Sequence, residues 1–391
     1  MKTDMEQTHY EGDELKQDPG TAVPDITEMD QRILSEIVCV QITPEEMHKI
    51  IMPVKQQPHQ KTVLAVHWHP EYIPMELIKK RIENTFPNKE QELIIPTQHN
   101  ELLTYDDQYH GAEIDCYSRG FQRKVQLLLH CRLEDPDRAG VLRSMLNHTY
   151  EYRSSQLFEL LDTFMDPKWE DYLQLAAEGT GVGEEVVHFA RVQTYKLYRL
   201  LQEHKNSISR DFLKNKLLRD FIDGQRHLYP DQFINRVQVF VKSVKKIVKA
   251  NFSLEYFYRT SEVIEEARSL GCGIVVPHPE QFWPILLCDY DIDGYEVWNP
   301  QSREYTEFLV NVINRQNKSR SRSQRPLLVF MGDDAHMGEK IKDPTKIEAA
   351  KYYREIGVQP AWDDLTIKKS LIIGNFDRRK VMNEYKTRLD G

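Results

Sequence analysis

Short apolar strands alternate with helical stretches along much of this chain, and this alternation limits the possible folds more than any other feature of the sequence. The first run contains "TVLAVH", "PMELIKKRIENTF", "QELIIPT" and "KVQLLLH". Strand and helix in this order are typical of β/α units, because a helix is the usual crossover between parallel strands. The pattern therefore predicts an α/β fold with a mainly parallel sheet or barrel.

The alternation stops after Leu133 and resumes with "TSEVIEEARSLGCGIVVPHP". The residues between read as helices, and "FINRVQVFVKSVKKIVKANF" places its apolar residues on one side at helical spacing. A second pattern precedes the first strand, where Thr43 and Glu46 form a capping-box signature. The predicted organisation is a disordered acidic tail (1–25), N-terminal helices packed on the barrel (26–60), the barrel (61–133 and 251–391) and a helical insertion (134–250).

Composition excludes several classes of protein. The five cysteines of this 391-residue chain are scattered, odd in number and without a C-x-x-C pair, which argues against a disulfide framework and a zinc knuckle. No apolar run is long enough to cross a bilayer, and "MKTDMEQTHYEGDELKQD" lacks the apolar core of a secretory signal. We therefore expect a cytoplasmic protein with no membrane partner. The sequence does not indicate an oligomeric state.

Imidazoles and carboxylates recur where the predicted strands end. Taken alone, the pair in "VHWHP" is typical of surface histidines in a turn. In parallel α/β folds, however, the carboxyl ends of the strands gather on one face, so these residues become neighbours. Together they form a ligand set suited to Zn²⁺, Mn²⁺ or Fe²⁺. The candidates are His67, His69, His99, Glu113, His130, His278, Asp334 and His336.

Six short motifs then occur in the order found in one known family. They are "HWH", "TQHN", "GAEID", "EARSLGCGIVVPHP", "GYEVWNP" and "MGDDAH". In these motifs the chain resembles the polymerase and histidinol phosphatase (PHP) superfamily of metal-dependent phosphoesterases. The resemblance implies a distorted (β/α)7 TIM-like barrel with two or three divalent ions, and a hydrolase in which a metal-bridging hydroxide attacks a phosphate ester.

The resemblance also implies how the ligands divide between the ions. One ion would take His67, His69, Glu113 and Asp334, and a second would share Glu113 and take His278. Gln126 stands where the family has another histidine, so His130 on the same face is the predicted substitute. A third ion would use His99 and His336. Pro74 and Met75 occupy the positions of its remaining ligand, which leaves Glu71 or Glu76 as the alternative.

The implied partner is a small phosphorylated substrate. His188 and Arg191, in "EEVVHFAR" of the insertion, are candidate substrate-binding residues, and the alternative is that they pack on an amphipathic helix.

Two further functions remain open from the sequence. A degenerate barrel that binds a ligand or a partner protein would explain Gln98 and Gln126, which depart from the family pattern. A nuclease on the same scaffold would explain the basic residues Lys318, Arg320, Arg322 and Arg325. The net charge of −9 favours an ordinary solvated surface there, so nucleic acid is a less favoured partner.

Overall fold

The computed structural model describes residues 24–391, apart from 135, 205–206, 322–323 and 343–348. The predicted acidic tail lies outside the described residues except for residues 24–25, and so does Arg322. The strands are β1 (Thr62–Ala65), β2 (Trp68–His69), β3 (Gln91–Ile94), β4 (Leu103–Thr104), β5 (Tyr109–Ser118), β6 (Arg123–Arg132), β7 (Gly273–Val276), β8 (Gly294–Trp298), β9 (Leu328–Met331) and β10 (Ala335–His336).

Helices precede, interrupt and follow these strands. They are α1 (Glu28–Ile37), α2 (Pro44–Ile51), α3 (Met75–Thr85), α4 (Gly140–Met165), α5 (Glu170–Thr180), α6 (Glu184–His204), α7 (Lys216–Asp223), α8 (Asp231–Asn251), α9 (Thr260–Ser269), α10 (Thr306–Ser319), α11 (Ala349–Tyr352), α12 (Leu365–Ile373) and α13 (Arg378–Leu389). The predicted mixed α/β class is confirmed.

The largest sheet has six strands in the order β4-β5-β6-β7-β8-β9. Its second half, β7-β8-β9, is parallel as predicted, but β4, β5, β6 and β7 pair antiparallel. The expectation of a mainly parallel sheet is therefore wrong for this half. The cause is the connection between β5 and β6, which spans only residues 119–122 and is too short for the crossover that a parallel pair needs.

The remaining strands form two small parallel pairs, β1-β3 and β2-β10. A few backbone hydrogen bonds join these pairs to the large sheet. The backbone N–H of Asp334, after β9, donates to the carbonyl of His67 over 2.9 Å, and that of Asn100, after β3, donates to the carbonyl of Glu113 over 2.7 Å. Within the described part of the chain, the three sheets therefore do not close into a continuous barrel of paired strands. The hydrogen bonds above hold their edges together.

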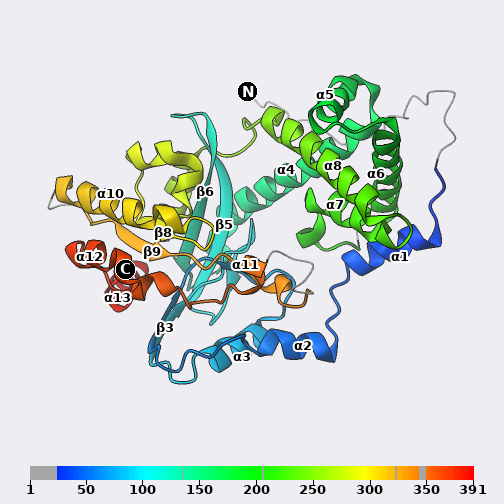
Figure 1. The fold of residues 1–391 in the computed structure, drawn as a ribbon. Coiled ribbons are helices and arrows are strands. Elements are labelled where there is room, and N and C mark those ends of the chain that lie inside the picture. Colours follow the sequence, from blue (N-terminus) through cyan, green and yellow to red (C-terminus); the bar gives the residue numbers. More distant parts are fainter. Residues whose placement is uncertain (1–23, 135, 205–206, 322–323, 343–348) are drawn as a thin grey trace.

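The helical segment between β6 and β7 has its own apolar core. In Figure 1, α5 to α8 gather into a lobe on one side of the long strands β5 and β6, and α10, α12 and α13 lie on the other side. Val237, Phe240 and Val244 of α8 are fully buried in this lobe, as the helical spacing predicted.

The two N-terminal helices pack on different parts of the molecule. The predicted capping box of Thr43 and Glu46 on α2 is confirmed, and this helix contacts α3. By contrast, α1 does not pack on the strands as expected. Its Ile33 and Leu34 belong to the core of the helical lobe, and Lys196 of α6 pairs with its Asp30 over 2.8 Å.

Cys131 of β6 and Cys272, which precedes β7, form a disulfide across 141 positions of sequence. The pairing of His130 with Gly273 places the two cysteines opposite each other on neighbouring strands. The scattered cysteines did not predict this bridge, because the two positions become adjacent only once the insertion has folded away.

Among the described residues, no helix is both long enough and apolar enough to cross a bilayer.

Candidate metal centre

Most of the predicted ligands converge at the carboxyl ends of the strands. His67 follows β1, His99 follows β3, His278 follows β7 and Asp334 follows β9, while Glu113 points inward from within β5. Their side chains are largely buried, and His67, His69 and Glu113 are no more than 2% exposed. The parallel strands thus place the ligands as the sequence predicted, and Glu113 is added from the antiparallel hairpin.

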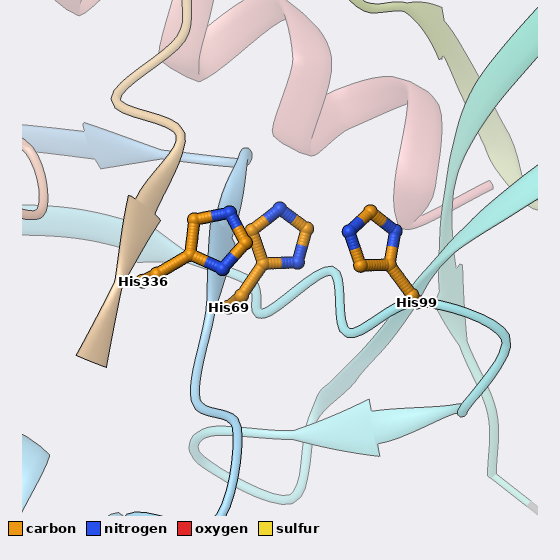
Figure 2. Close-up of side chains that lie close together, drawn as sticks. All are labelled: His69, His99 and His336. Atoms are coloured by element: carbon orange, nitrogen blue, oxygen red, sulfur yellow. The ribbon is translucent and has the colours of Figure 1, made fainter. Parts of the chain in front are cut away.

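Three imidazole rings form a row in this centre (Figure 2). The ring of His69 lies between those of His336 and His99, with centroid distances of 4.3 and 4.4 Å. His69 and His336 are neighbours because the two residues are directly paired across β2 and β10. A bridge between His99 and Glu113 fixes the third ring beside the carboxylate.

A second group surrounds the carboxylates. His69 Nε2 lies 3.5 Å from both Glu113 Oε2 and Asp334 Oδ1. Asp334 Oδ1 also lies 3.7 Å from His67 Nε2 and 3.4 Å from His336 Nε2. Two ligands bound about 2.1 Å from one tetrahedral ion would be about 3.4 Å apart. These separations are thus too long for good hydrogen bonds and suit atoms that share a cation.

Unpartnered buried atoms test whether the residues fit a metal. Among the described residues, neither ring nitrogen of His69 has a hydrogen-bond partner, and Nδ1 of His99 and Oε2 of Glu113 are not oriented to bond although they lie 2.8 Å apart. Nδ1 of His278 is also buried and unpartnered. Buried polar atoms without partners are costly, so several of them in one place indicate a missing ligand. The donor set fits a divalent cation.

Backbone strain is also concentrated here. Glu71, Asn100, His278 and Asp334 all adopt positive φ angles, between 29° and 56°. Residues other than glycine rarely adopt a positive φ angle, and those that do are often found at functional sites. The turns that carry Glu71, His278 and Asp334 are therefore held in conformations that aim these three side chains into the centre.

Glu296 completes the buried wall beside His67. Its Oε2 lies 2.5 Å from His67 Nδ1, so the other ring nitrogen, Nε2, faces the centre. The space for this carboxylate depends on Gly332, because a Cβ atom at that position would lie only 1.9 Å from Oε2 of Glu296. We did not predict Glu296. The available signal was a single acidic residue inside the apolar strand "GYEVW".

Electrostatics keep two of the ligands in metal-binding states. Burial and the neighbouring rings of His336 and His99 lower the pKa of His69 to about 3, so this ring is neutral. Burial alone would raise the pKa of Asp334, but the neighbouring imidazoles of His336, His69 and His67 hold it well below its usual range. A neutral imidazole and an ionised carboxylate are the forms that bind metal ions.

The other carboxylate oxygen of Asp334, Oδ2, is bonded to an arginine side chain. This oxygen accepts a hydrogen bond from the Arg354 guanidinium over 2.8 Å, and Gln301 donates to the same atom over 3.2 Å. Oδ1 is therefore the atom left for the centre.

Between the two alternatives for a further ligand, the structure favours Glu71. Its Oε1 lies 3.1 Å from Nδ1 of His336, and its Oε2 accepts a hydrogen bond from the N–H of Gly338. Glu76 points to solvent with 79% of its side chain exposed. Glu71 reaches inward because its left-handed backbone turns the chain directly after His69 and Pro70.

His130 is not brought to the centre, which corrects its prediction as a ligand. Its Nε2 lies 2.9 Å from the carbonyl of Val66 and its Nδ1 lies 2.6 Å from the Tyr385 hydroxyl. Both nitrogens are thus engaged in the core. Gln126 is the residue beside the centre, where its amide donates to Glu113 Oε1.

The proposed substrate-binding pair from the insertion also lies elsewhere. His188 lines a cavity of about 420 Å³ among helices of the lobe, and Arg191 pairs with Glu170 of α5. A different part of the insertion, residues 210–214, reaches the centre instead. There Asp211 accepts a hydrogen bond from Gln98 over 2.6 Å, and Lys214 Nζ lies 3.7 Å from Glu71. The sequence offered no periodic or motif signal for this segment.

Comparisons with known proteins add one neighbour. Neither a family model nor a curated protein matches the chain. Among solved structures, it is similar to the crystal structure of a putative metal-dependent phosphoesterase from Bifidobacterium adolescentis, with 17% identity and a TM-score of 0.42 over 81% of this chain and 98% of that one.

Proposed function

We propose that this protein is a metal-dependent phosphoesterase, a hydrolase of the EC 3.1 type that acts on a small phosphomonoester, a nucleotide or a similar ester. The observation that carries the proposal is the group of buried ligand atoms of His69, His99, Glu113 and His278 that have no hydrogen-bond partner among the described residues. His69 joins this group to Asp334, since its Nε2 lies 3.5 Å from both Glu113 and Asp334. Serine and cysteine nucleophiles are not needed for such a reaction. We further infer that the strands belong to a distorted (β/α)7 barrel, in which a few hydrogen bonds between sheet edges replace complete ladders.

The donor set suits two or three ions of zinc, manganese or iron. When bound, such ions would activate water as a nucleophile and neutralise the charge of the phosphoryl oxygens. His67, His69, Glu113 and Asp334 would hold one ion, and Glu113 and His278 would hold another. His99, His336 and Glu71 would hold the third.

Other residues keep these ligands in position. Glu296 directs Nε2 of His67 toward the centre, and Arg354 holds one oxygen of Asp334 so that the other faces inward. Gln126 fixes the Glu113 carboxylate. Lys214 is about half exposed beside Glu71 and supplies positive charge where an anionic substrate would enter.

The test is to measure metal content and phosphate release on one set of preparations. Wild type, Asp334→Asn and the exposed control Asp289→Asn would be assayed by elemental mass spectrometry and with a panel of nucleotides and sugar phosphates. We expect wild type and Asp289→Asn to hold at least one transition metal and to release phosphate, and Asp334→Asn to lose about 100-fold or more in activity.

Two results would count against the proposal. A wild-type protein that holds no transition metal under any preparation contradicts the metal centre. A protein that binds metal and ligands tightly but never releases phosphate would indicate instead a degenerate barrel that acts by binding.

A further inference from the structure

A cavity of about 390 Å³ opens beside the metal centre. Glu71 belongs to both places, because its carboxylate is hydrogen-bonded to His336 and to the N–H of Gly338 while the residue also lines the cavity. Pro70, which directly follows His69, lines it as well. A molecule in this cavity would therefore lie next to whatever the centre binds.

The cavity wall is mainly apolar. Ile73, Met75, Leu102 and Leu103 contribute aliphatic side chains to it. The volume falls near the lower end of the range of about 300–1,000 Å³ that is usual for small-molecule sites. Such a space suits one ring or a short branched chain.

Two nitrogen-bearing side chains give this apolar space a polar part. His110 is only 9% exposed, and its Nδ1 has no hydrogen-bond partner among the described residues. Arg143, near the start of α4, contributes a guanidinium group to the lining. Burial and this guanidinium lower the pKa of His110, so the histidine is neutral and Arg143 provides the positive charge.

We propose that this cavity binds the organic part of the substrate, and that this part is an apolar ring or short chain carrying a carboxylate. The carboxylate would pair with Arg143 and receive a hydrogen bond from His110, while the phosphate ester faces the metal centre. The inference rests on the proposed function and names its substrate class, the phosphate esters of small organic acids. It also gives the helical segment between β6 and β7 a role in specificity, because Arg143 lies near the start of α4 in that segment.

The experiment compares two non-hydrolysable ligands that differ only in the carboxylate, phenylphosphonate and 3-carboxyphenylphosphonate. Their dissociation constants would be measured by calorimetry on the full chain as purified. A charge-assisted hydrogen bond commonly changes affinity by about tenfold or more. We therefore expect wild type to bind the carboxylated ligand at least about tenfold more tightly than phenylphosphonate.

Three variants locate the effect. Arg143→Gln, at an exposed position, should make the two dissociation constants equal, whereas the half-buried control Arg191→Gln, which removes the ion pair with Glu170 on α5, should keep the wild-type ratio. Leu103→Trp, which fills the apolar space, should weaken the binding of both ligands. Circular dichroism spectra would establish that each variant is folded.

Hydrolysis of p-nitrophenyl phosphate, assayed in parallel, separates this inference from the proposed function. If the ester is not hydrolysed but the carboxylate preference is present and depends on Arg143, the binding cavity stands and the phosphoesterase proposal fails. If the ester is hydrolysed but wild type binds both phosphonates equally, or neither of them, the cavity is not a carboxylate site and this inference is overturned. A preference that survives Arg143→Gln overturns it as well.

Discussion

Nδ1 of His67 and Oε2 of Glu296 lie 2.5 Å apart, with both side chains only 1% exposed. Carboxylates that bond the far nitrogen of a metal-binding histidine orient the ring and increase its basicity, and their loss typically costs 10–100-fold in metal affinity. A change at Glu296 therefore tests whether His67 is a metal ligand.

We expect Glu296→Gln to lower metal affinity by about 10–100-fold while the protein remains folded. The amide keeps the size of the side chain but removes the charge beside His67. Competition with a chromophoric chelator would measure the affinity, and Glu304→Gln, on the surface, is the matched control. Equal affinities for the two variants would mean that His67 does not bind metal.

Gly332→Ala should disturb the same wall by steric means. The added Cβ would lie 1.9 Å from the buried Glu296 carboxylate, so either the carboxylate or the backbone must move. Overpacking of this kind typically costs about 1–3 kcal/mol. We expect a lower unfolding free energy in urea together with weaker metal binding.

Gly179→Ala provides the control for that substitution. Its Cβ would meet no atom within 4 Å, and Gly179 lies inside α5. Alanine is favoured over glycine in a helix by up to about 1 kcal/mol, so this variant should be slightly more stable. If Gly332→Ala behaved in the same way, the close packing against Glu296 would be refuted.

Glu71→Gln should reduce the number of bound ions by one relative to wild type. Glu71 contacts His336, whereas Glu76 is exposed and pairs with Lys79. Glu76→Gln should therefore keep the full complement. Native mass spectrometry would count the ions, and an equal count for both variants would show that Glu71 is not a ligand.

His130 should make the folded state sensitive to acid. Burial lowers its pKa to about 3, whereas an exposed histidine has a pKa near 6.5, so below that pH the unfolded chain binds a proton that the folded chain does not. The unfolding free energy should therefore fall by about 1.4 kcal/mol per pH unit on acidification from 6.5.

His130→Gln should remove this part of the slope. The unfolding free energy would be measured in urea between pH 4.5 and 6.5, a range that lies below the usual pKa of histidine. The variant would be compared with wild type and with the exposed control His59→Gln. If all three proteins show the same slope, His130 is not held neutral in the fold.

The sequence predicted most of the residues that gather at the centre because each depends on a short pattern and one rule of topology. His67, His99, His278 and Asp334 each follow a strand, and parallel strands end on the same face. His130 met the same face criterion but lies too deep, where Val66 and Tyr385 hold its ring. A strand pattern gives the face of a residue and not its depth.

Contacts between distant segments could not be predicted in this way. Asp211 meets Gln98 across 113 positions of sequence, and helical periodicity does not say which part of an insertion turns toward the strands. Glu71 reaches the centre because its own backbone is left-handed, and no glycine at this position signals such a conformation in the sequence. His188 and Arg191 were placed on a helix correctly, but that helix lies within the lobe.

The sulfur bridge between Cys131 and Cys272 also determines how the chain carries mechanical load. The two cysteines stand where the polypeptide leaves for the helical lobe and where it returns. Tension applied between β1 and the C-terminal helix α13 would pass from β6 to β7 through the sulfur atoms and would bypass the stretch between them. The lobe that contributes Lys214 is thus a side branch of that path, and a pulling force would reach it instead through α1, whose Ile33 and Leu34 lie in its core.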